Sequence, residues 1–275
     1  MKKAETKPIT FGALKSDAQI FKELESGRYA WWERVKSNPD LYVEIRKDNE
    51  VHVYYEGGRV LRLRYCSKRK EVQAFTHNKY LTRDENATGY ENCAKLLDAQ
   101  LDTIIENVHL YSRKHGIEDK EKWSEKYIQG NLIINHRLQY LDSEFAYNSG
   151  DIRIDLVECV NGEIRFVELK RIDDARMVTK DGKPEIVDQI EQYQIFIDLH
   201  EKEIIDYYQI VYDIKARLGL SIPPISPEKL NPMPFLLIFN RWTKDHPMRE
   251  KHKIEMEKIL KDKKIDYKII NSFED

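Results

Sequence analysis

The sequence has few cysteines, and they form no recognisable framework. Only three of its 275 residues are cysteine, and Cys66, Cys93 and Cys159 lie far apart without Cys-x-x-Cys spacing. Structural zinc sites and disulfide-rich scaffolds both depend on closely and regularly spaced cysteines. We therefore expect neither a zinc site nor a disulfide framework.

Long hydrophobic runs are also missing. A transmembrane helix needs about 20 consecutive, mainly apolar residues, and no stretch of the sequence approaches that length. The first ten residues, MKKAETKPIT, are basic but lack the apolar segment of a signal peptide. These absences predict a protein that does not cross a membrane and that resides in the cytoplasm.

Charged residues are abundant. They make up 34% of the chain against 41% hydrophobic residues, and the net charge is only −2. Basic residues outnumber acidic ones over residues 1–80, whereas acidic residues are in excess over the remainder. A basic N-terminal part and an acidic remainder suit a protein that binds a polyanion with one part and cations with the other. Ordinary fluctuation of charge along a highly charged chain gives the same balance, so both interpretations stay open.

Residues 1–88 are predicted to form a β-rich N-terminal region. A helix over 15–36, broken near Ser26-Gly27, precedes segments in which apolar residues alternate and short Gly, Asn or Asp turns intervene. This pattern is typical of a β-meander. The expected strands cover residues 41–46, 51–56, 59–66 and 71–76.

Three arginines alternate with apolar residues in the third of these strands. Arg59, Arg62 and Arg64 lie in RVLRLRY, and tyrosines occur close by. A basic, aromatic sheet face can bind nucleic acid, so we name these three as candidate nucleic-acid-binding residues. The solvated side of a half-buried sheet has the same pattern, and this alternative remains.

Residues 89–275 are predicted to form the second domain, of the α/β class. The expected helices cover residues 89–115, 118–137, 185–218 (with a break) and 245–262. The expected strands cover residues 138–147, 151–160, 163–172, 235–239 and 266–270, and the Pro-rich stretch 221–234 is predicted to be a loop. The core order is α-β-β-β-α-β, which indicates a mixed sheet flanked by helices.

The central hairpin carries the residues most suited to chemistry. Asp155 lies within an otherwise apolar strand, and Glu168 and Lys170 are two apart on the next strand, so their side chains share one face. With Asn161-Gly162 as the two turn residues, position 155 pairs with position 168. The sequence therefore predicts two carboxylates and one amine in a single cluster.

Two facing carboxylates repel unless a cation or a proton lies between them. Mg²⁺ suits such a pair because it binds one or two carboxylates and fills its octahedron with waters and phosphate oxygens. Lys170 could then orient a water nucleophile and offset charge in the transition state. The alternative is a buried ion pair that only ties the two strands together.

Ile154-Asp155 on one strand, a hairpin, and Glu168-Leu169-Lys170 on the next resemble the PD-(D/E)xK nuclease superfamily. The resemblance implies a restriction-endonuclease-like α-β-β-β-α-β core. It implies that Asp155, Glu168 and the main-chain carbonyl of Leu169 bind the metal and that Lys170 is the catalytic lysine.

Further site residues follow from the same resemblance. Family members often add an acid from the element before the Asp strand, which points to Glu144 as a further catalytic and metal residue, with Asp142 as the alternate. Gln189 and Tyr193 fit the Gln-x-x-x-Tyr pattern of the RecB-like branch. Four residues apart on a helix, both side chains share one face.

The function that the resemblance implies is hydrolysis of phosphodiester bonds with Mg²⁺ or Mn²⁺ as the cofactor. DNA is the favoured partner and endonuclease action is favoured over exonuclease action, although the residues themselves do not separate DNA from RNA. A homodimer would supply the two sites that double-strand cutting needs. The alternative is a catalytically inactive nuclease fold that serves as a nucleic-acid-binding or protein-interaction module.

Overall fold

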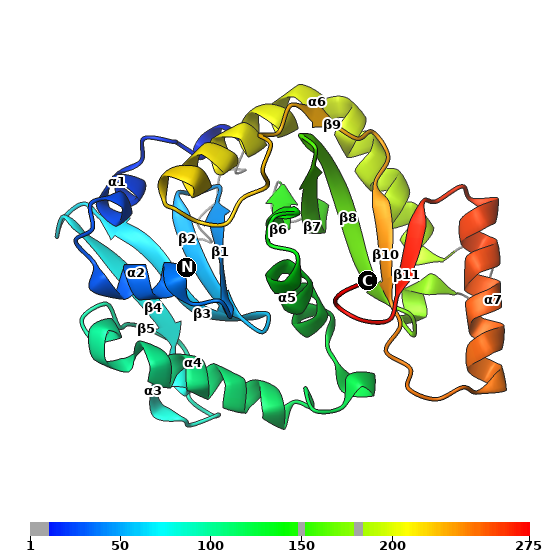
Figure 1. Cartoon of the computed structure of the whole chain (residues 1–275), viewed down its shortest axis with the longest axis horizontal. Coiled ribbons are helices and arrows are strands. Elements are labelled where there is room, and N and C mark those ends of the chain that lie inside the picture. The colour runs from blue at the N-terminus through cyan, green and yellow to red at the C-terminus, as the bar shows by residue number, and fades with distance from the viewer. Residues whose placement is uncertain (1–10, 148–151, 179–183) are drawn as a thin grey trace, which may run out of the picture.

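The computed structural model describes residues 11–147, 152–178 and 184–275. Two sheets lie side by side, and helix α6 extends along both of them (Figure 1). The chain is therefore mixed α/β, as predicted. The predicted turn at 148–150 lies outside the described residues.

The first sheet is an antiparallel meander in the order β1-β2-β3-β4-β5. Four strands were predicted and are confirmed within one residue at each end, whereas β5 was missed because we assigned residues 89–115 to one helix. Residues 90–92 instead pair with β4, and the helix begins only at Leu97, where buried apolar residues start to recur at helical spacing. The strands are Leu41–Arg46 (β1), Glu50–Tyr55 (β2), Gly58–Cys66 (β3), Glu71–His77 (β4) and Tyr90–Asn92 (β5).

Helices α1 and α4 pack on one face of this sheet, whereas the other face carries polar side chains and also contacts α5 through Tyr42 and Tyr54. The buried face carries Val51, Val53, Leu61 and Leu63, which share a core with α1 and α4. The break predicted near Gly27 is confirmed, since its φ of +72° falls in the left-handed region that glycine adopts without strain. The elements are Phe11–Ala13 (η1), Gln19–Glu25 (α1), Ala30–Ser37 (α2), Asn78–Thr82 (α3) and Leu97–Lys114 (α4).

A β-bulge in β3 determines where the first candidate arginine lies. Val53 pairs with Leu61 but Tyr54 pairs with Arg59, so Val60 is an extra residue in the ladder. Side chains alternate between faces along a regular strand, which would separate position 59 from position 62. The inserted residue reverses that alternation and places Arg59 on the same polar face as Arg62.

The second sheet is mixed and has the order β11-β10-β8-β7-β6. Strands β6, β7 and β8 are antiparallel, whereas β10 runs parallel to both β8 and β11. A short strand, β9, pairs with β8 inside the stretch that we predicted to be only loop. The strands are Tyr140–Tyr147 (β6), Ile152–Val160 (β7), Glu163–Arg171 (β8), Lys229–Leu230 (β9), Phe235–Phe239 (β10) and Tyr267–Ile270 (β11).

Helices cover both faces of the second sheet. Helix α5 packs through Ile128 and Leu132 on one face, and α6 packs through Phe196 on the other. The predicted break in α6 is confirmed at His200, whose φ and ψ are not helical. Among the residues that the structure describes, no helix is long and apolar enough to span a bilayer. The elements are Lys120–Lys122 (η2), Glu125–Asn135 (α5), Ala175–Met177 (η4), Glu185–Arg217 (α6) and Pro247–Asp262 (α7).

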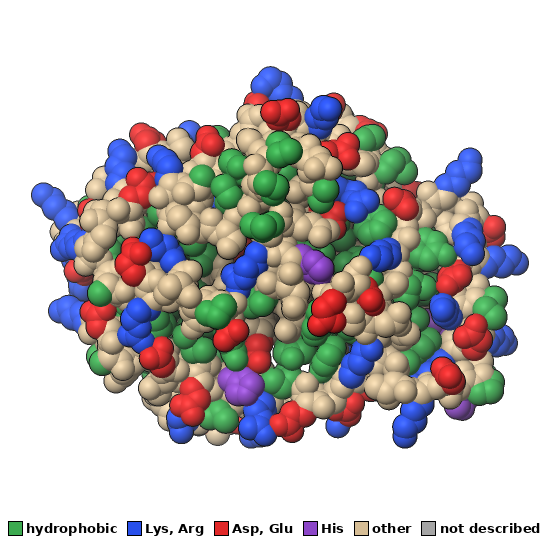
Figure 2. All heavy atoms as spheres, in the orientation of Figure 1, with side chains coloured by type: hydrophobic (Ala, Val, Ile, Leu, Met, Phe, Trp, Pro, Cys, Tyr) green, Lys and Arg blue, Asp and Glu red, His purple; other side chains and the backbone are tan. Residues whose placement is uncertain are grey.

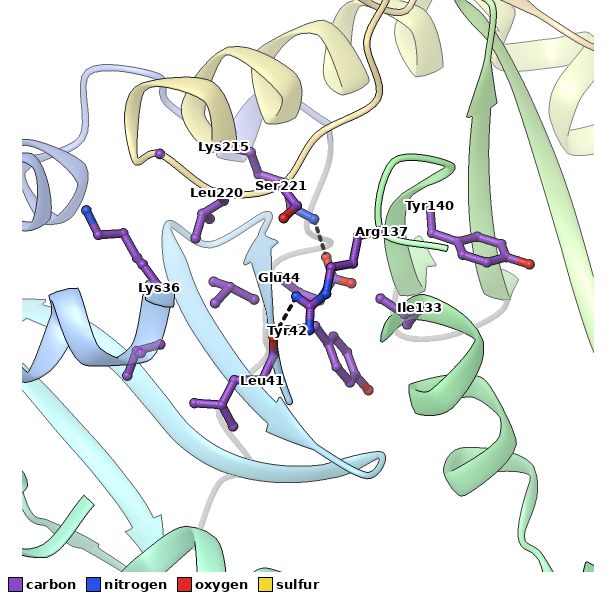
Figure 3. Close-up of a pocket in the computed structure, with 13 residues that line it drawn as sticks. Lys36, Leu41, Tyr42, Glu44, Ile133, Arg137, Tyr140, Lys215, Leu220 and Ser221 are labelled. Carbon is purple, nitrogen blue, oxygen red and sulfur yellow. Dashed lines mark hydrogen bonds and ion pairs between the residues drawn. The ribbon is translucent and has the colours of Figure 1, made fainter. Parts of the chain in front are cut away.

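Buried ion pairs join the two sheets. Lys215 of α6 donates to Glu44 of β1 at 2.8 Å and to the carbonyl of Leu141 at 2.6 Å. Arg46 of β1 donates to Asp142 of β6 at 2.9 Å. Figure 3 shows Lys215 and Glu44 pointing toward one another beside a cavity of about 60 Å³. We call these four side chains the ionic junction: Glu44, Arg46, Asp142 and Lys215.

Contacts of the first sheet continue beyond residue 88. Strand β5 completes that sheet, and α4 packs against β2 and β3. One hydrophobic core also includes residues from both sheets, for example Leu61 and Phe166. The division of the chain into domains at residues 88 and 89 stays a prediction.

The ionic junction predicts a large cost for removing its cation. Lys215→Met leaves the Glu44 carboxylate, which is 2% exposed, without its ammonium partner. Breaking a buried pair in this way costs roughly 3–5 kcal/mol, so we expect a loss of that size in the free energy of unfolding, measured by urea denaturation. Lys202→Met is the matched control on the same helix. Lys202 is 85% exposed and pairs with Asp206 at the surface, where such pairs contribute about 0–1 kcal/mol. Equal losses in the two variants would contradict the prediction.

Candidate active site

A tight hairpin sets the register of β7 and β8. Asn161 and Gly162 both have positive φ, of 53° and 77°, as a two-residue type I′ turn requires. Leu156 pairs with Val167 and Val160 with Glu163, which is the register predicted from the Asn-Gly turn. Asp155 and Glu168 occupy the next facing positions beyond Leu156 and Val167, on the side away from the turn.

The ammonium group of Lys170 lies where three oxygen atoms converge. Its Nζ hydrogen-bonds a carboxylate oxygen of Glu168, lies 3.0 Å from the carbonyl oxygen of Leu169 and is 3.7 Å from Oδ2 of Asp155. The side chains of Lys170 and Glu168 are 1% exposed, whereas that of Asp155 is 20% exposed. The predicted cluster of two carboxylates and one amine is therefore present, and solvent reaches it at Asp155.

Two side chains from α6 complete the surroundings of Glu168. Gln189 Nε2 donates to Oε1 of Glu168 at 2.7 Å, and the Tyr193 hydroxyl lies 2.8 Å from Oε2. Gln189 also donates to the Tyr193 hydroxyl at 2.7 Å. The spacing of four residues on a helix aims both side chains at one carboxylate, as the shared helical face predicted.

Main-chain groups and α5 hold Asp155 in place. Its Oδ2 accepts the backbone N–H of Leu169 at 2.9 Å. The amide of Gln129, a buried side chain on α5, donates to the main-chain carbonyl of Asp155. Asp155 is thus held by β8 through Leu169 and by α5 through Gln129.

Burial opposes the ionised forms of the cluster. Burial and the charge of Asp155 raise the pKa of Glu168 to about 7. Burial also raises the pKa of Asp155, an effect that Lys170 and the N–H of Leu169 reduce. Burial raises the pKa of Tyr193, which keeps its phenol protonated. One ammonium beside two carboxylates leaves a net negative charge when both are ionised, and this favours a further cation.

The two candidate acids on β6 have different surroundings. Glu144 lies between Ser143 and Phe145, which pair with Leu156 and Ile154, so its backbone lies opposite Asp155, although its positive φ of 50° interrupts the regular strand geometry there. Its carboxylate is 3.4 Å from Lys126 Nζ, and its charge contributes to raising the pKa of Asp155. Glu144 therefore lies at the rim of the cluster.

The alternate, Asp142, is not at the cluster. It is 1% exposed and belongs to the ionic junction, where it accepts from Arg46 and from the backbone N–H of Ser143 at 2.8 Å. The hydroxyl of Tyr208 lies 3.3 Å from its other oxygen. Asp142 is wrong as a rim acid because these donors hold its carboxylate at the boundary between the sheets.

Sequence reasoning missed Glu125, at the start of α5. Burial raises its pKa, and the next largest influences are the charges of Lys170 and Asp155, so it lies within electrostatic reach of the cluster. Arg176 of η4 pairs with it at 3.7 Å. The available signal was its position directly after Ser124, which caps the helix before the three core strands.

The donor set fits a hard divalent cation. Oxygens of Asp155, Glu168 and Leu169 lie together around the Lys170 ammonium, and Mg²⁺ prefers oxygen ligands of this kind, completed by waters and phosphate. Within the described ranges, no group of three or more His, Cys, Asp or Glu side chains could hold a metal ion. The candidate ligands are therefore the carboxylates of Asp155 and Glu168 and the main-chain carbonyl of Leu169, and not a cluster of three side chains.

The three candidate arginines have different partners. Arg62 donates through Nε to Glu50 at 2.7 Å, so its charge is already paired. The guanidinium of Arg64 lies 4.3 Å from the ring centroid of Phe75, and that of Arg59 lies 5.2 Å from the ring centroid of Tyr90. Their role in binding nucleic acid stays a prediction, and Arg62 is the least available of the three.

Comparisons with family models, with curated proteins and with solved structures found no match to this chain. Evidence for a function therefore comes from the residues of this chain and their geometry. A fold alone does not define a function, whereas the chemistry of a site can support one.

The pairing of Arg62 predicts a pH dependence for the first sheet. Although burial acts in the opposite direction, hydrogen bonds from His52 and Arg62 lower the pKa of Glu50 to about 2. A depressed carboxyl pKa stabilises the folded state above the unfolded-state pKa of about 4.3, and this stabilisation is lost as the pH falls toward 2. We expect the melting temperature of Glu50→Gln to fall less steeply than that of the parent between about pH 5 and about pH 2.5.

The matched control is Glu91→Gln, which removes an exposed carboxylate from the same sheet. Its melting temperature should follow the parent profile over the same pH range. If Glu50→Gln and Glu91→Gln give the same profile, the Glu50–Arg62 pair does not contribute the expected stabilisation.

Proposed function

We propose that this protein is a Mg²⁺-dependent nuclease with a core of the PD-(D/E)xK type. The observation that carries the proposal is the convergence of oxygens from Asp155, Glu168 and Leu169 on the ammonium of Lys170, because the same oxygens could bind a divalent cation beside it. The order α5, β6, β7, β8, α6, β10 supports the same core. Phosphodiester hydrolysis is the reaction that this set of groups suits best.

Each group of the cluster has a role in this proposal. Asp155, Glu168 and the Leu169 carbonyl would hold the metal, with Glu144 at the rim. A bound metal would neutralise the scissile phosphate and lower the pKa of a coordinated water. Lys170 orients the water and offsets negative charge in the transition state. Gln189 and Tyr193 keep Glu168 in position by hydrogen bonds.

The composition of the cluster supports an active site over a purely structural ion pair. A structural pair needs one carboxylate for one ammonium, whereas Lys170 has two carboxylates beside it. The cluster is also accessible to solvent at Asp155, as it must be if a substrate phosphate is to reach a bound metal. Groups that interact strongly and have shifted pKa values are typical of functional sites.

One observation favours the competing function, an inactive nuclease fold that binds nucleic acid or another protein. The ammonium of Lys170 already lies at the point where the oxygens converge. A permanent ion pair there would leave no position for a metal. The two functions therefore differ in whether a divalent cation binds.

The substrate and the setting are part of the proposal. DNA is the proposed substrate and internal cleavage the proposed mode, because Asp155 is accessible to solvent and a site of this kind does not require a strand end. A homodimer would present two such sites to a duplex, and the proposed location is the cytoplasm.

Metal binding provides the test that separates the two functions. Millimolar Mg²⁺ or Mn²⁺ should raise the melting temperature of the parent, because a ligand that binds only the folded state adds RT ln(1 + [L]/Kd), about 2.7 kcal/mol at 100 times Kd. The increase should shrink in Glu168→Gln, which loses one metal ligand. Metal-dependent cleavage of plasmid DNA should disappear in both Glu168→Gln and Lys170→Ala.

Glu163→Gln is the matched control, since Glu163 is an exposed carboxylate on the same strand. It should keep the parent's metal response and cleavage. A parent whose melting temperature is the same in EDTA and in Mn²⁺, and which cleaves neither DNA nor RNA, would overturn the nuclease proposal and leave the inactive module.

A further inference from the structure

On the face shown in Figure 2, basic and acidic side chains are interspersed over the described residues. That face therefore has no broad basic surface for a polyanion, and a local arrangement of cations is the alternative basis for a binding site. The polar side of the first sheet contains one, in a pocket of about 510 Å³ beside β6 and α5.

We call this feature the Arg59–Lys79 pocket. It is lined from the first sheet, from α3 and α4, from the start of α5 and from β6. The polar and aromatic side chains that line it are Tyr54, Arg59, His77, Lys79, Tyr80, Tyr90, Tyr111, Lys126 and Glu144.

Two cations of the pocket have aromatic neighbours and no acidic partner. The ammonium of Lys79 lies 3.4 Å from the ring centroid of Tyr111, and the guanidinium of Arg59 lies 5.2 Å from that of Tyr90. Within the part of the chain that the structure describes, neither forms a salt bridge to a carboxylate. The pKa of His77, lowered by burial and then by the charges of Lys79 and Arg59, is consistent with a positive potential there. Unpaired cations in a pocket favour an anionic ligand.

Aromatic rings line the same pocket. Tyr90 is 54% exposed, although it lies in strand β5 and its ring contacts that of His77 at 5.1 Å. Nucleic-acid bases stack on exposed aromatic rings of this kind, with little dependence on base identity. Cations and aromatic rings together match a nucleotide, which has a phosphate and a flat base.

The pocket adjoins the candidate active site. Glu144 lines the pocket, and its backbone lies opposite Asp155 across β6 and β7. Close packing fixes this arrangement, because a Cβ on Gly57, in the turn between β2 and β3, would lie only 2.1 Å from the carbonyl oxygen of Lys126 on α5. Only glycine fits there without displacing the helix that carries Gln129.

We propose that the Arg59–Lys79 pocket binds one nucleotide of an unpaired strand next to the scissile phosphate. Arg59 and Lys79 contact its phosphate, and Tyr90 stacks on its base. A base inside a duplex is paired and stacked and must leave the helix to enter a pocket, so the substrate class is DNA with a single-stranded segment. This inference rests on the proposed nuclease function and defines its substrate.

Fluorescence anisotropy with labelled oligothymidylate, in EDTA so that no cleavage occurs, tests the pocket apart from catalysis. We expect Arg59→Gln/Lys79→Gln to raise Kd roughly tenfold or more at low salt. Its plot of log Kd against log salt concentration should flatten by about 0.7 for each lost phosphate contact. Tyr90→Leu should raise Kd roughly tenfold while leaving that slope unchanged, because it removes stacking and no charge.

Two further variants control for charge and folding. Lys258→Gln removes an exposed cation from α7 and should bind as the parent does. Lys79→Arg keeps the charge and should retain binding, so that a loss in Arg59→Gln/Lys79→Gln reflects charge and not misfolding. Melting temperatures of all variants should stay close to that of the parent.

The pocket proposal is overturned if Arg59→Gln/Lys79→Gln binds oligothymidylate with the parent's Kd and salt slope. It is also overturned if blunt duplex DNA is bound as tightly as the single strand and loses affinity equally in that variant. Either result together with metal-dependent cleavage by the parent would leave the nuclease function standing. Weakened binding in the variant together with a parent that never cleaves would support the pocket and overturn the nuclease function.

Discussion

The ionic junction between β1 and β6 is the interaction on which the arrangement of the two sheets depends. Glu44 and Lys215 are almost fully buried, and Arg46 pairs with the buried Asp142 beside them. Buried charges tolerate little displacement, because each loses its hydration and relies on a fixed partner. The junction therefore favours one relative position of the meander and the second sheet. In that position, the polar face of the meander lies next to the strands that carry Glu144 and Asp155.

The same electrostatic rule governs the candidate active site. Two buried carboxylates require a cation or a proton between them, and in this structure the ammonium of Lys170 lies beside both. When both carboxylates are ionised the cluster carries a net negative charge, with Glu168 surrounded by donors from α6 and Asp155 reaching solvent. Under the proposed function, such an arrangement would bind a second cation, and Lys170 would both neutralise a carboxylate and orient water.

Much of the second sheet and its cluster was predictable from the sequence. An Asn-Gly turn between two apolar strands allows one favoured register, and a period of two then places Asp155, Glu168 and Lys170 on one face. The spacing of Gln189 and Tyr193 gave their common helical face for the same local reason. The start of α4 was harder to predict, because residues 90–92 have no strong strand pattern and become a strand only by pairing with β4.

The α/β class, most strand limits and the grouping of the three cluster residues were predictable from local patterns, since turns and periodicity are local properties of the chain. The folded structure was needed to show that Asp142 belongs to the junction, that Arg62 is paired with Glu50 and that Glu125 lies near Lys170. It also decided the face on which Arg59 lies, through the bulge at Val60, and it gathered Lys79, Tyr90 and Tyr111 around that arginine. These outcomes depend on contacts between residues distant along the chain, where packing and desolvation select a partner that no local pattern specifies.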